Sequence, residues 1–262
     1  MIRALYTAAS GMSAQQANLD TVANNLANSA TAGFRERRLQ FEDMIYQNVI
    51  VPGSPESPQT DSAGLQIGLG TKSAAAEMIM KQGDFNNTSN PLDVAIQGTG
   101  FFQISRPDGT LAYTRAGNFH LTNQGMLVTS EGDTLLPAIS IPSNATDITI
   151  SQYGVVSAKI PGQTTPAQLG TIQLATFANP GGLNSIGGNL LTQTEASGNP
   201  ITDTPGGTSG MGTLQQGYLE NSNVDVVAEF VQMILAQRAY ESNSKVVHVA
   251  DDMYSQINGL IR

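Results

Sequence analysis

The sequence predicts an α+β protein in which long N- and C-terminal helices pair as a coiled-coil-like domain. An all-β domain, barrel-like or sandwich-like, is inserted between them. Three observations indicate this fold class. Apolar residues recur at helical spacing at both ends, the middle changes to short alternating segments with glycine-rich turns, and proline- or glycine-rich stretches separate these regions. A chain of 262 residues is long enough for two such domains.

The first 30 residues have the heptad pattern of a packing helix, followed by Gly33 as a plausible stop. We expect its seam to serve in assembly and to consist of Leu5, Met12, Leu19, Val22 and Leu26. The alternative is an ordinary amphipathic helix that packs only on its own domain. Asparagines, which form helices poorly, favour a helix that folds only against partners; they stand at Asn18, Asn24, Asn25 and Asn28.

A second long helix is expected from Val224 onward, capped by Ser222 or Asn223. Its assembly seam is predicted from two apolar stripes separated by the polar stretch 237–244: Val227, Val231, Ile234, Val246, Met253, Ile257 and Leu260. Residues 1–40 carry four arginines and two acidic groups, a net charge of +2. Residues 222–262 carry three basic and five acidic groups, a net charge of −2. The opposite signs agree with pairing of the two helices, although exposed ion pairs contribute little.

The middle of the chain reads as a series of short strands with turn signals between them. The expected strands are 92–96, 101–104, 111–114, 126–129, 147–151, 155–159 and 170–176. We therefore expect a β-rich domain over 71–205, a helical domain formed by 1–32 and 222–262, and extended connecting segments at 33–70 and 206–221. Three prolines within 52–58 predict an extended backbone there, with a disordered loop as the alternative.

Composition excludes several classes of function. The net charge of −9 argues against nucleic acid as a partner, because phosphate binding requires clustered basic residues. Cysteine is absent, which excludes disulfides and thiolate chemistry. No run of 18 apolar residues occurs, so we expect no insertion into a membrane. Charged residues make up only 13%, which suits a surface that neighbouring molecules cover.

The sequence offers no convincing active site. The two histidines, His120 and His248, belong to different halves of the predicted fold. The dinucleotide and phosphate-loop glycine patterns are both broken, and no G-x-S-x-G occurs. We therefore expect no catalytic residues, no cofactor and no metal. The N-terminus also lacks the unbroken apolar run of a secretory signal, so a cleaved signal peptide is not expected.

Both ends and the middle resemble the signatures of bacterial flagellar rod and hook proteins, most closely those of the distal rod. The segments that carry the resemblance are 10–17, 23–28, 31–35, 92–102, 113–117, 219–224 and 237–241. The motif residues singled out by it are Asn24, Asn25, Asn28, Gly33, Phe34, Asn223, Gln237, Arg238 and Tyr240. Many relatives carry lysine at the position of Arg35, a difference that keeps the charge.

The resemblance implies a structural subunit of the flagellar drive shaft. The terminal helices would form an inner tube and the β-domain its outer layer. It implies export through the flagellar export apparatus, a place in the periplasm-spanning rod, and contacts with copies of itself, with other rod and hook proteins, and with the peptidoglycan-associated and outer-membrane rings. Two alternatives remain open: another axial subunit of the same family, proximal rod or hook, and a secreted enzyme acting on the cell wall.

Overall fold

The computed structural model describes residues 2–50, 64–163, 165–207 and 209–260. The chain divides into two units that each pack within themselves. Unit 1 comprises Met1–Ala27, Arg37–Glu77 and Asp225–Arg262, and unit 2 comprises Asn28–Glu36 and Met78–Val224. These boundaries differ from the expected division. Residues 28–36, 206–207 and 209–224 belong to the β-rich unit, and residues 37–50 and 64–77 belong to the unit that contains the helices.

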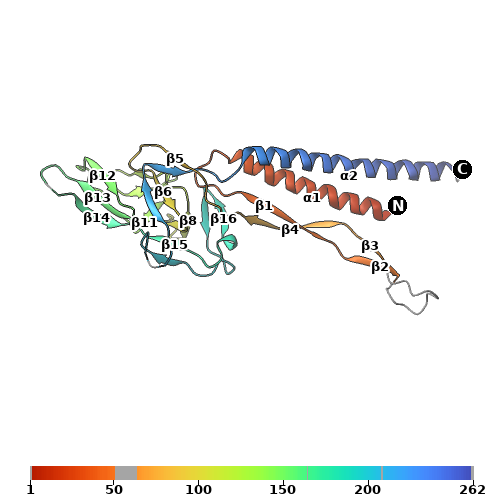
Figure 1. Cartoon of the computed structure of the whole chain (residues 1–262), viewed down its shortest axis with the longest axis horizontal. Helices are drawn as coiled ribbons and strands as arrows, with labels where there is room; N and C mark the ends of the chain where they lie inside the picture. The colour runs from red at the N-terminus through yellow and green to blue at the C-terminus, as the bar shows by residue number, and fades with distance from the viewer. Residues whose placement is uncertain (1, 51–63, 164, 208, 261–262) are drawn as a thin grey trace. The chain divides into compact units, whose positions relative to one another are not determined.

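Unit 1 contains the two predicted helices, α1 (Ile2–Ala27) and α2 (Val226–Leu260), which lie side by side (Figure 1). They run antiparallel, because Asn25 bonds to Glu229 while Gly11 lies against Asn243. Helix α1 ends at Ala27, before the expected stop at Gly33. The N-cap of α2 is Asp225, whose carboxylate accepts hydrogen bonds from the next turn, and not Ser222 or Asn223. Neither helix, over its described length, is apolar enough to cross a membrane.

The segment expected as a connection at 33–70 contains strands instead. They are β1 (Arg37–Asp43), β2 (Tyr46–Ile50) and β3 (Leu65–Gly68), followed by β4 (Thr71–Met78). Strand β1 pairs with β4 and β2 pairs with β3, which makes two narrow ribbons (Figure 1). The proline segment 51–60, for which an extended backbone is expected, lies outside the described residues.

Unit 2 is the predicted β-rich domain. Its strands are β5 (Phe85–Asn87), β6 (Val94–Gln97), β7 (Phe101–Ser105), β8 (Leu111–Thr114), β9 (His120–Leu121), β10 (Leu127–Val128), β11 (Thr134–Leu136), β12 (Asp147–Ile150), β13 (Val155–Lys159), β14 (Ala167–Thr171), β15 (Leu174–Thr176), β16 (Asn184–Gly187), β17 (Leu190–Thr192), β18 (Ile201–Asp203), β19 (Thr213–Gln216) and β20 (Tyr218–Glu220). The expected strand at 170–176 is divided between β14 and β15. The expected connection at 206–221 contains β19 and β20.

The largest sheet of unit 2 runs in the order β16-β17-β8-β7-β11-β10-β9; off this path, β15 pairs with β7 and β18 pairs with β15. The described strands at its ends, β16 and β9, do not pair, so the sheet is not a closed barrel. Strands β12, β13 and β14 form a second sheet, while β6 pairs with β19 and β5 with β20. The last two pairs join the chain's C-terminal third to its middle.

The core of unit 2 lies between these sheets. Phe102 is fully buried and meets Phe119 edge to face, with 5.1 Å between the ring centroids. Around this pair pack the apolar residues of β6, β7, β13 and β15, including Ile96, Val156 and Leu174. A second cluster around Tyr113 and Phe177 covers the other side of β7 and β8. Both faces of β7 are buried, and three of its five residues, Phe101, Phe102 and Ile104, are apolar.

Candidate assembly site

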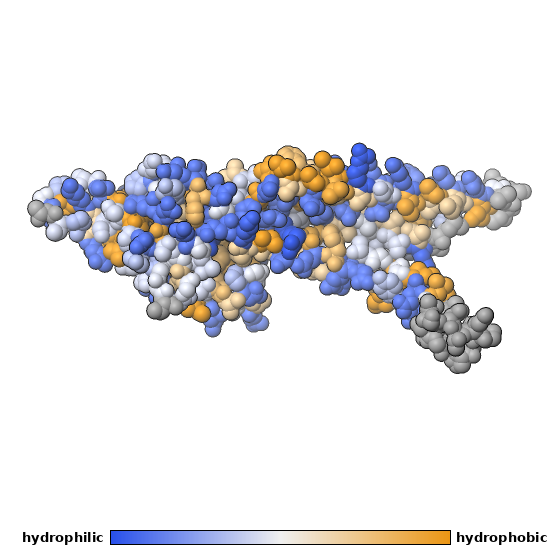
Figure 2. All heavy atoms as spheres, in the orientation of Figure 1, coloured by the Kyte–Doolittle hydropathy of each residue, from blue (hydrophilic) through white to orange (hydrophobic). Residues whose placement is uncertain are grey.

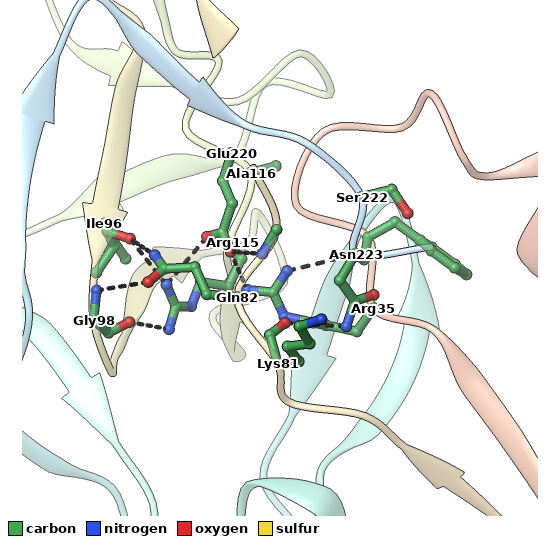
Figure 3. Close-up of polar contacts among 12 residues, drawn as sticks. Arg35, Lys81, Gln82, Ile96, Gly98, Arg115, Ala116, Glu220, Ser222 and Asn223 are labelled. Atoms are coloured by element: carbon green, nitrogen blue, oxygen red, sulfur yellow. Dashed lines mark hydrogen bonds and ion pairs between the residues drawn. The ribbon is translucent and has the colours of Figure 1, made fainter. Parts of the chain in front are cut away.

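Three of the sequence signatures meet at one buried place in unit 2. Arg35, from the N-terminal signature, donates from Nη2 to Glu220 Oε1 at 2.6 Å. Arg115, from the middle signature, donates from Nη1 to Glu220 Oε2 at 3.1 Å. The exposed fractions of the three side chains are 4%, 8% and 0% for Arg35, Arg115 and Glu220. We call these residues the ionic junction; Figure 3 shows both guanidinium groups directed at the one carboxylate.

The junction holds two cations and one anion, so backbone groups must compensate the second positive charge. Arg115 also donates to the carbonyl oxygens of Ile96, at 3.2 Å, and Gly98, at 2.5 Å. Burial lowers the pKa of Arg115 to about 10, a shift that the Glu220 carboxylate opposes and the Arg35 charge increases. The guanidinium therefore stays charged at neutral pH, and removal of Glu220 would leave two buried cations without an anion.

Two amide side chains form hydrogen bonds with backbone groups next to the ionic junction (Figure 3). Gln82 donates to the Ile96 carbonyl at 2.6 Å and accepts from the Gly98 amide at 3.2 Å. Asn223 accepts from the Glu36 amide at 2.7 Å and donates to the carbonyls of Ile79, at 2.9 Å, and Lys81, at 3.0 Å. Asn223, which the sequence suggested as a helix cap, therefore joins two separate chain segments inside unit 2.

Gly33 brings the N-terminal signature against this site. Its amide donates to the Glu220 carbonyl at 2.8 Å, and its φ angle is +72°. A Cβ at this position would lie 2.5 Å from the Ala116 backbone nitrogen, so a larger residue would displace backbone. Phe34, its neighbour in the signature, is half-buried, and its carbonyl accepts a hydrogen bond from Arg35. Gly33 is thus required for close approach inside unit 2, six residues beyond the end of α1.

In unit 1 the motif residue Asn25 has a similar role. It is 1% exposed, exchanges two hydrogen bonds with the backbone of Arg37, at 2.8 and 3.0 Å, and donates to Glu229 Oε1 at 3.2 Å. One amide thus connects α1, β1 and α2, which gives a reason for an asparagine inside a helix. Its neighbour Asn24 is exposed, and Asn28 accepts a hydrogen bond from Thr31 at 3.2 Å.

The two helices of unit 1 meet through small residues. Ala8 and Ala14 are buried on α1, and Ala236 and Ala250 are buried on α2. Of the predicted N-terminal seam, Val22 is buried and the other members are half-buried: Leu5, Met12, Leu19 and Leu26. The N-terminal seam therefore lies partly in the contact between the helices and partly beside it.

Most of the predicted C-terminal seam lies on the exposed surface of α2, while Val246 and Met253 border Ala4 of α1. Large apolar side chains follow the exposed surface of α2, with Val227 at 72% and Ile234 at 56% exposure. We call this set the apolar stripe: Val227, Phe230, Val231, Ile234, Leu235, Val246, Val249, Met253 and Ile257. The side chain of Leu260 lies outside the described residues. Figure 2 shows the hydrophobic residues gathered over the first half of α2.

The remaining motif residues also lie on this open surface of α2. Gln237 and Arg238 are exposed, Arg238 lies 3.7 Å from Glu241 in an exposed ion pair, and Tyr240 is 39% exposed. Six of the nine motif residues therefore fall into two groups. Asn25, Gly33 and Asn223 hold the chain together, while Gln237, Arg238 and Tyr240 face away from it.

Comparison with known protein families gives three matches that lie in order along the chain. Residues 5–35 match the model "Flagella basal body rod protein", residues 95–158 match "Flagellar hook protein FlgE/F/G D1 domain", and residues 215–260 match "Flagellar basal body rod FlgEFG protein C-terminal". The ionic junction takes one residue from the first of these regions, one from the second and one from the third.

Relatives that match along the full length of the chain define the family more narrowly. The flagellar basal-body rod protein FlgG of Borreliella burgdorferi is 49% identical over 100% of both chains, and that of Buchnera aphidicola from Acyrthosiphon pisum is 46% identical over 99% of this chain and 100% of its own. The chain belongs to the FlgG family of flagellar basal-body rod proteins. FlgG of Bacillus subtilis is 40% identical over 100% of both chains. The resemblance inferred from the signatures is thereby confirmed.

FlgG proteins are structural rod proteins, so the chain is not an enzyme, and the cell-wall enzyme considered above has no support. No group of three or more metal-ligating side chains is found among the described residues. A solved hook protein structure, FlgE2 of Helicobacter pylori, aligns with 71% of this chain and 43% of its own at 17% identity. Its TM-score of 0.25 carries no argument about this chain.

Proposed function

We propose that the chain is a subunit of the distal flagellar rod, in which copies assemble into a helical tube that transmits motor torque to the hook. Unit 1 forms the inner tube and unit 2 the outer layer. The observation that carries the proposal is the apolar stripe, whose side chains are 39–72% exposed in the described chain. Apolar surface of this extent usually marks a protein interface, because leaving it in water costs free energy.

The geometry of the stripe favours a polymer over a closed dimer. It runs along much of α2, from Val227 to Ile257, and α1 occupies a different face of the same helix. A helix with an apolar face left over after intramolecular pairing requires another helix on that side. If that helix belongs to the next copy, the contact is heterologous, and repeating it produces a filament unless it closes into a ring.

The same proposal covers location and partners. As a rod subunit the chain would contact other rod and hook proteins at the two ends of its segment, and the peptidoglycan-associated and outer-membrane rings along its outer surface. It would reach the rod through the flagellar export apparatus without cleavage of a signal peptide. The distal rod is favoured over the proximal rod and hook by the full-length identity to FlgG.

Electron microscopy of the concentrated, purified chain tests the proposal. We expect filaments or tubes from the unmodified chain and none from the double variant Val231→Ser/Ile234→Ser, because it makes the middle of the stripe polar. The matched control is Ile201→Ser, which changes an apolar side chain of unit 2 that is 54% exposed. Equal polymerisation of all three proteins would contradict the proposal, and labelled subunits found outside the distal rod in isolated basal bodies would assign the chain to another axial position.

A further inference from the structure

The chain passes between the two units four times. The passages lie at 27/28, 36/37, 77/78 and 224/225. Any force transmitted along the backbone from one unit to the other must go through these four points. On the unit 2 side they lead into three segments, 28–36, 78–84 and 219–224. What holds these segments to one another inside unit 2 decides whether a force on one of them is shared.

The segments 28–36 and 219–224 are joined directly. Arg35 donates to the Glu220 carboxylate at 2.6 Å, and the Gly33 amide donates to the Glu220 carbonyl at 2.8 Å. The Glu36 amide donates to Asn223 Oδ1 at 2.7 Å. These bonds lie at successive positions along both segments, so the two segments run beside each other and separate only if several bonds break together.

The segment 78–84 is joined to both of the others. The Ile79 amide donates to the Glu36 carbonyl at 2.9 Å. The Gly83 amide donates to Glu220 Oε1 at 3.0 Å, and the Asn221 amide donates to the Asp84 carbonyl at 2.8 Å. Asn223 adds its bonds to the Ile79 and Lys81 carbonyls. Glu220 and Asn223 therefore each contact all of the segments that lead to the four passages.

The ionic junction also connects these three segments to the central strands of unit 2. Arg115 follows β8, and its guanidinium connects Glu220 to the carbonyls of Ile96 and Gly98 on either side of the end of β6. The Arg115 guanidinium carbon lies 5.6 Å from the centre of the Phe101 ring on β7. A pull on the 28–36 segment therefore acts on β6, β7 and β8 through side chains, in addition to the backbone.

We propose that the ionic junction and Asn223 form a mechanical clamp that shares force among the four chain passages, so that no single segment is peeled from unit 2. This inference rests on the proposed function, because a torque-transmitting subunit has use for such a clamp. The two kinds of substitution differ in the charge that they leave behind, because the Glu220 carboxylate pairs with both guanidinium groups. Replacing Arg35 leaves the Arg115–Glu220 pair with no net charge, whereas replacing Glu220 leaves two unpaired cations.

Single-molecule pulling on the isolated full chain tests the clamp. The chain contains no cysteine, so Ala30→Cys and Asn123→Cys, both at exposed positions of unit 2, provide unique attachment points. At constant force we measure the rate at which the 28–36 segment is released. We expect Arg35→Met and Asn223→Ala each to raise this rate about tenfold or more, because each removes side-chain hydrogen bonds that link the segments. The matched control is Glu195→Gln, an exposed glutamate of unit 2, which should leave the rate unchanged.

Release rates within about twofold of the parent for both Arg35→Met and Asn223→Ala would overturn the clamp. Arg35→Lys provides a finer comparison, because it keeps a cation near Glu220 and should lie between the parent and Arg35→Met. A rate for Arg35→Lys above that for Arg35→Met would also contradict the proposal. The pulling measurement uses single subunits, so a negative result would contradict the clamp and would not bear on polymerisation. A chain that fails to polymerise would contradict the proposed function and would not bear on the clamp.

Discussion

Unit 2 and unit 1 differ in how much of their large apolar side chains they bury. Unit 2 buries large side chains such as Phe102 and Ile96 completely and places even its charged residues Arg35 and Glu220 inside. Unit 1 joins its helices through alanines and leaves large side chains such as Val227 and Ile234 in water. One unit is thus complete within a single chain, whereas the other has the surface of an interface. The stability of this molecule therefore has two sources: contacts within the chain stabilise unit 2, and contacts made on assembly complete unit 1.

The division has a physical origin in the residue types that each contact uses. Small residues at the α1–α2 contact allow close approach but bury little area, and burial contributes about 25 cal/mol for each Å² of apolar surface. Isolated helices are marginal in water and depend on packing of an apolar face. The largest apolar faces of unit 1 point away from the pair, so the free subunit lacks most of the packing that would stabilise its helices.

The largest expected effect comes from a cavity in the core of unit 2. Phe102→Ala removes a fully buried ring and its edge-to-face partner contact with Phe119, which should lower the free energy of unfolding of unit 2 by about 3–5 kcal/mol. Denaturant unfolding followed by the near-ultraviolet signal of the aromatic residues measures this loss. A loss below about 1 kcal/mol would mean that the β-rich unit is not packed as a single core.

A smaller effect is expected where the N-terminal signature enters unit 2. Gly33→Ala places a Cβ against the Ala116 backbone in a left-handed conformation, so unfolding of unit 2 should become about 2–3 kcal/mol easier. The matched control is Gly109→Ala, which has a similar φ angle of +81° but no atom near its Cβ position, so it isolates the backbone strain from the collision. Equal losses in the two variants would show that the close approach to Ala116 is unimportant.

The smallest of the three effects is expected in unit 1. Asn25→Ala removes three hydrogen bonds that connect α1, β1 and α2, and should make opening of the helix pair about 1–2 kcal/mol easier. Hydrogen exchange of the α1 amides in the full chain measures the change, with the exposed Gln16→Ala as control. Faster exchange in unit 2 as well would contradict the separation of the two units on which the comparison depends.

Sequence patterns predicted the local features of the fold well. The strands expected at 101–104, 111–114 and 155–159 agree within one residue with β7, β8 and β13. Alternation and turn residues are properties of neighbouring positions, so a single sequence reveals them. The strands β1–β4 were missed because residues 37–50 and 64–78 show little alternation of burial, and most of their side chains are exposed in the subunit.

The contacts that connect distant segments could not be read in the same way. Arg35 and Glu220 are 185 positions apart, and no periodicity links them. Their presence inside two signatures was the available signal, together with the scarcity of charge in this chain. The compact unit that contains Glu220 includes residues 28–36 and 209–224 and resumes at Met78, whereas the β-rich domain expected from the sequence spans 71–205. Periodicity likewise identified the apolar residues of α2, but it does not reveal which of them pack against α1 and which stay exposed in the subunit.

Hydrogen exchange of the free subunit and of the assembled filament shows whether assembly completes the packing of unit 1. In the free subunit we expect weaker protection along α1 and α2 than in β6, β7 and β8, because only unit 2 has a complete core. In the filament, the helices should become at least about tenfold more protected while unit 2 changes little. Helices that are as strongly protected in the free subunit as in the filament would contradict the claim that unit 1 is completed by assembly.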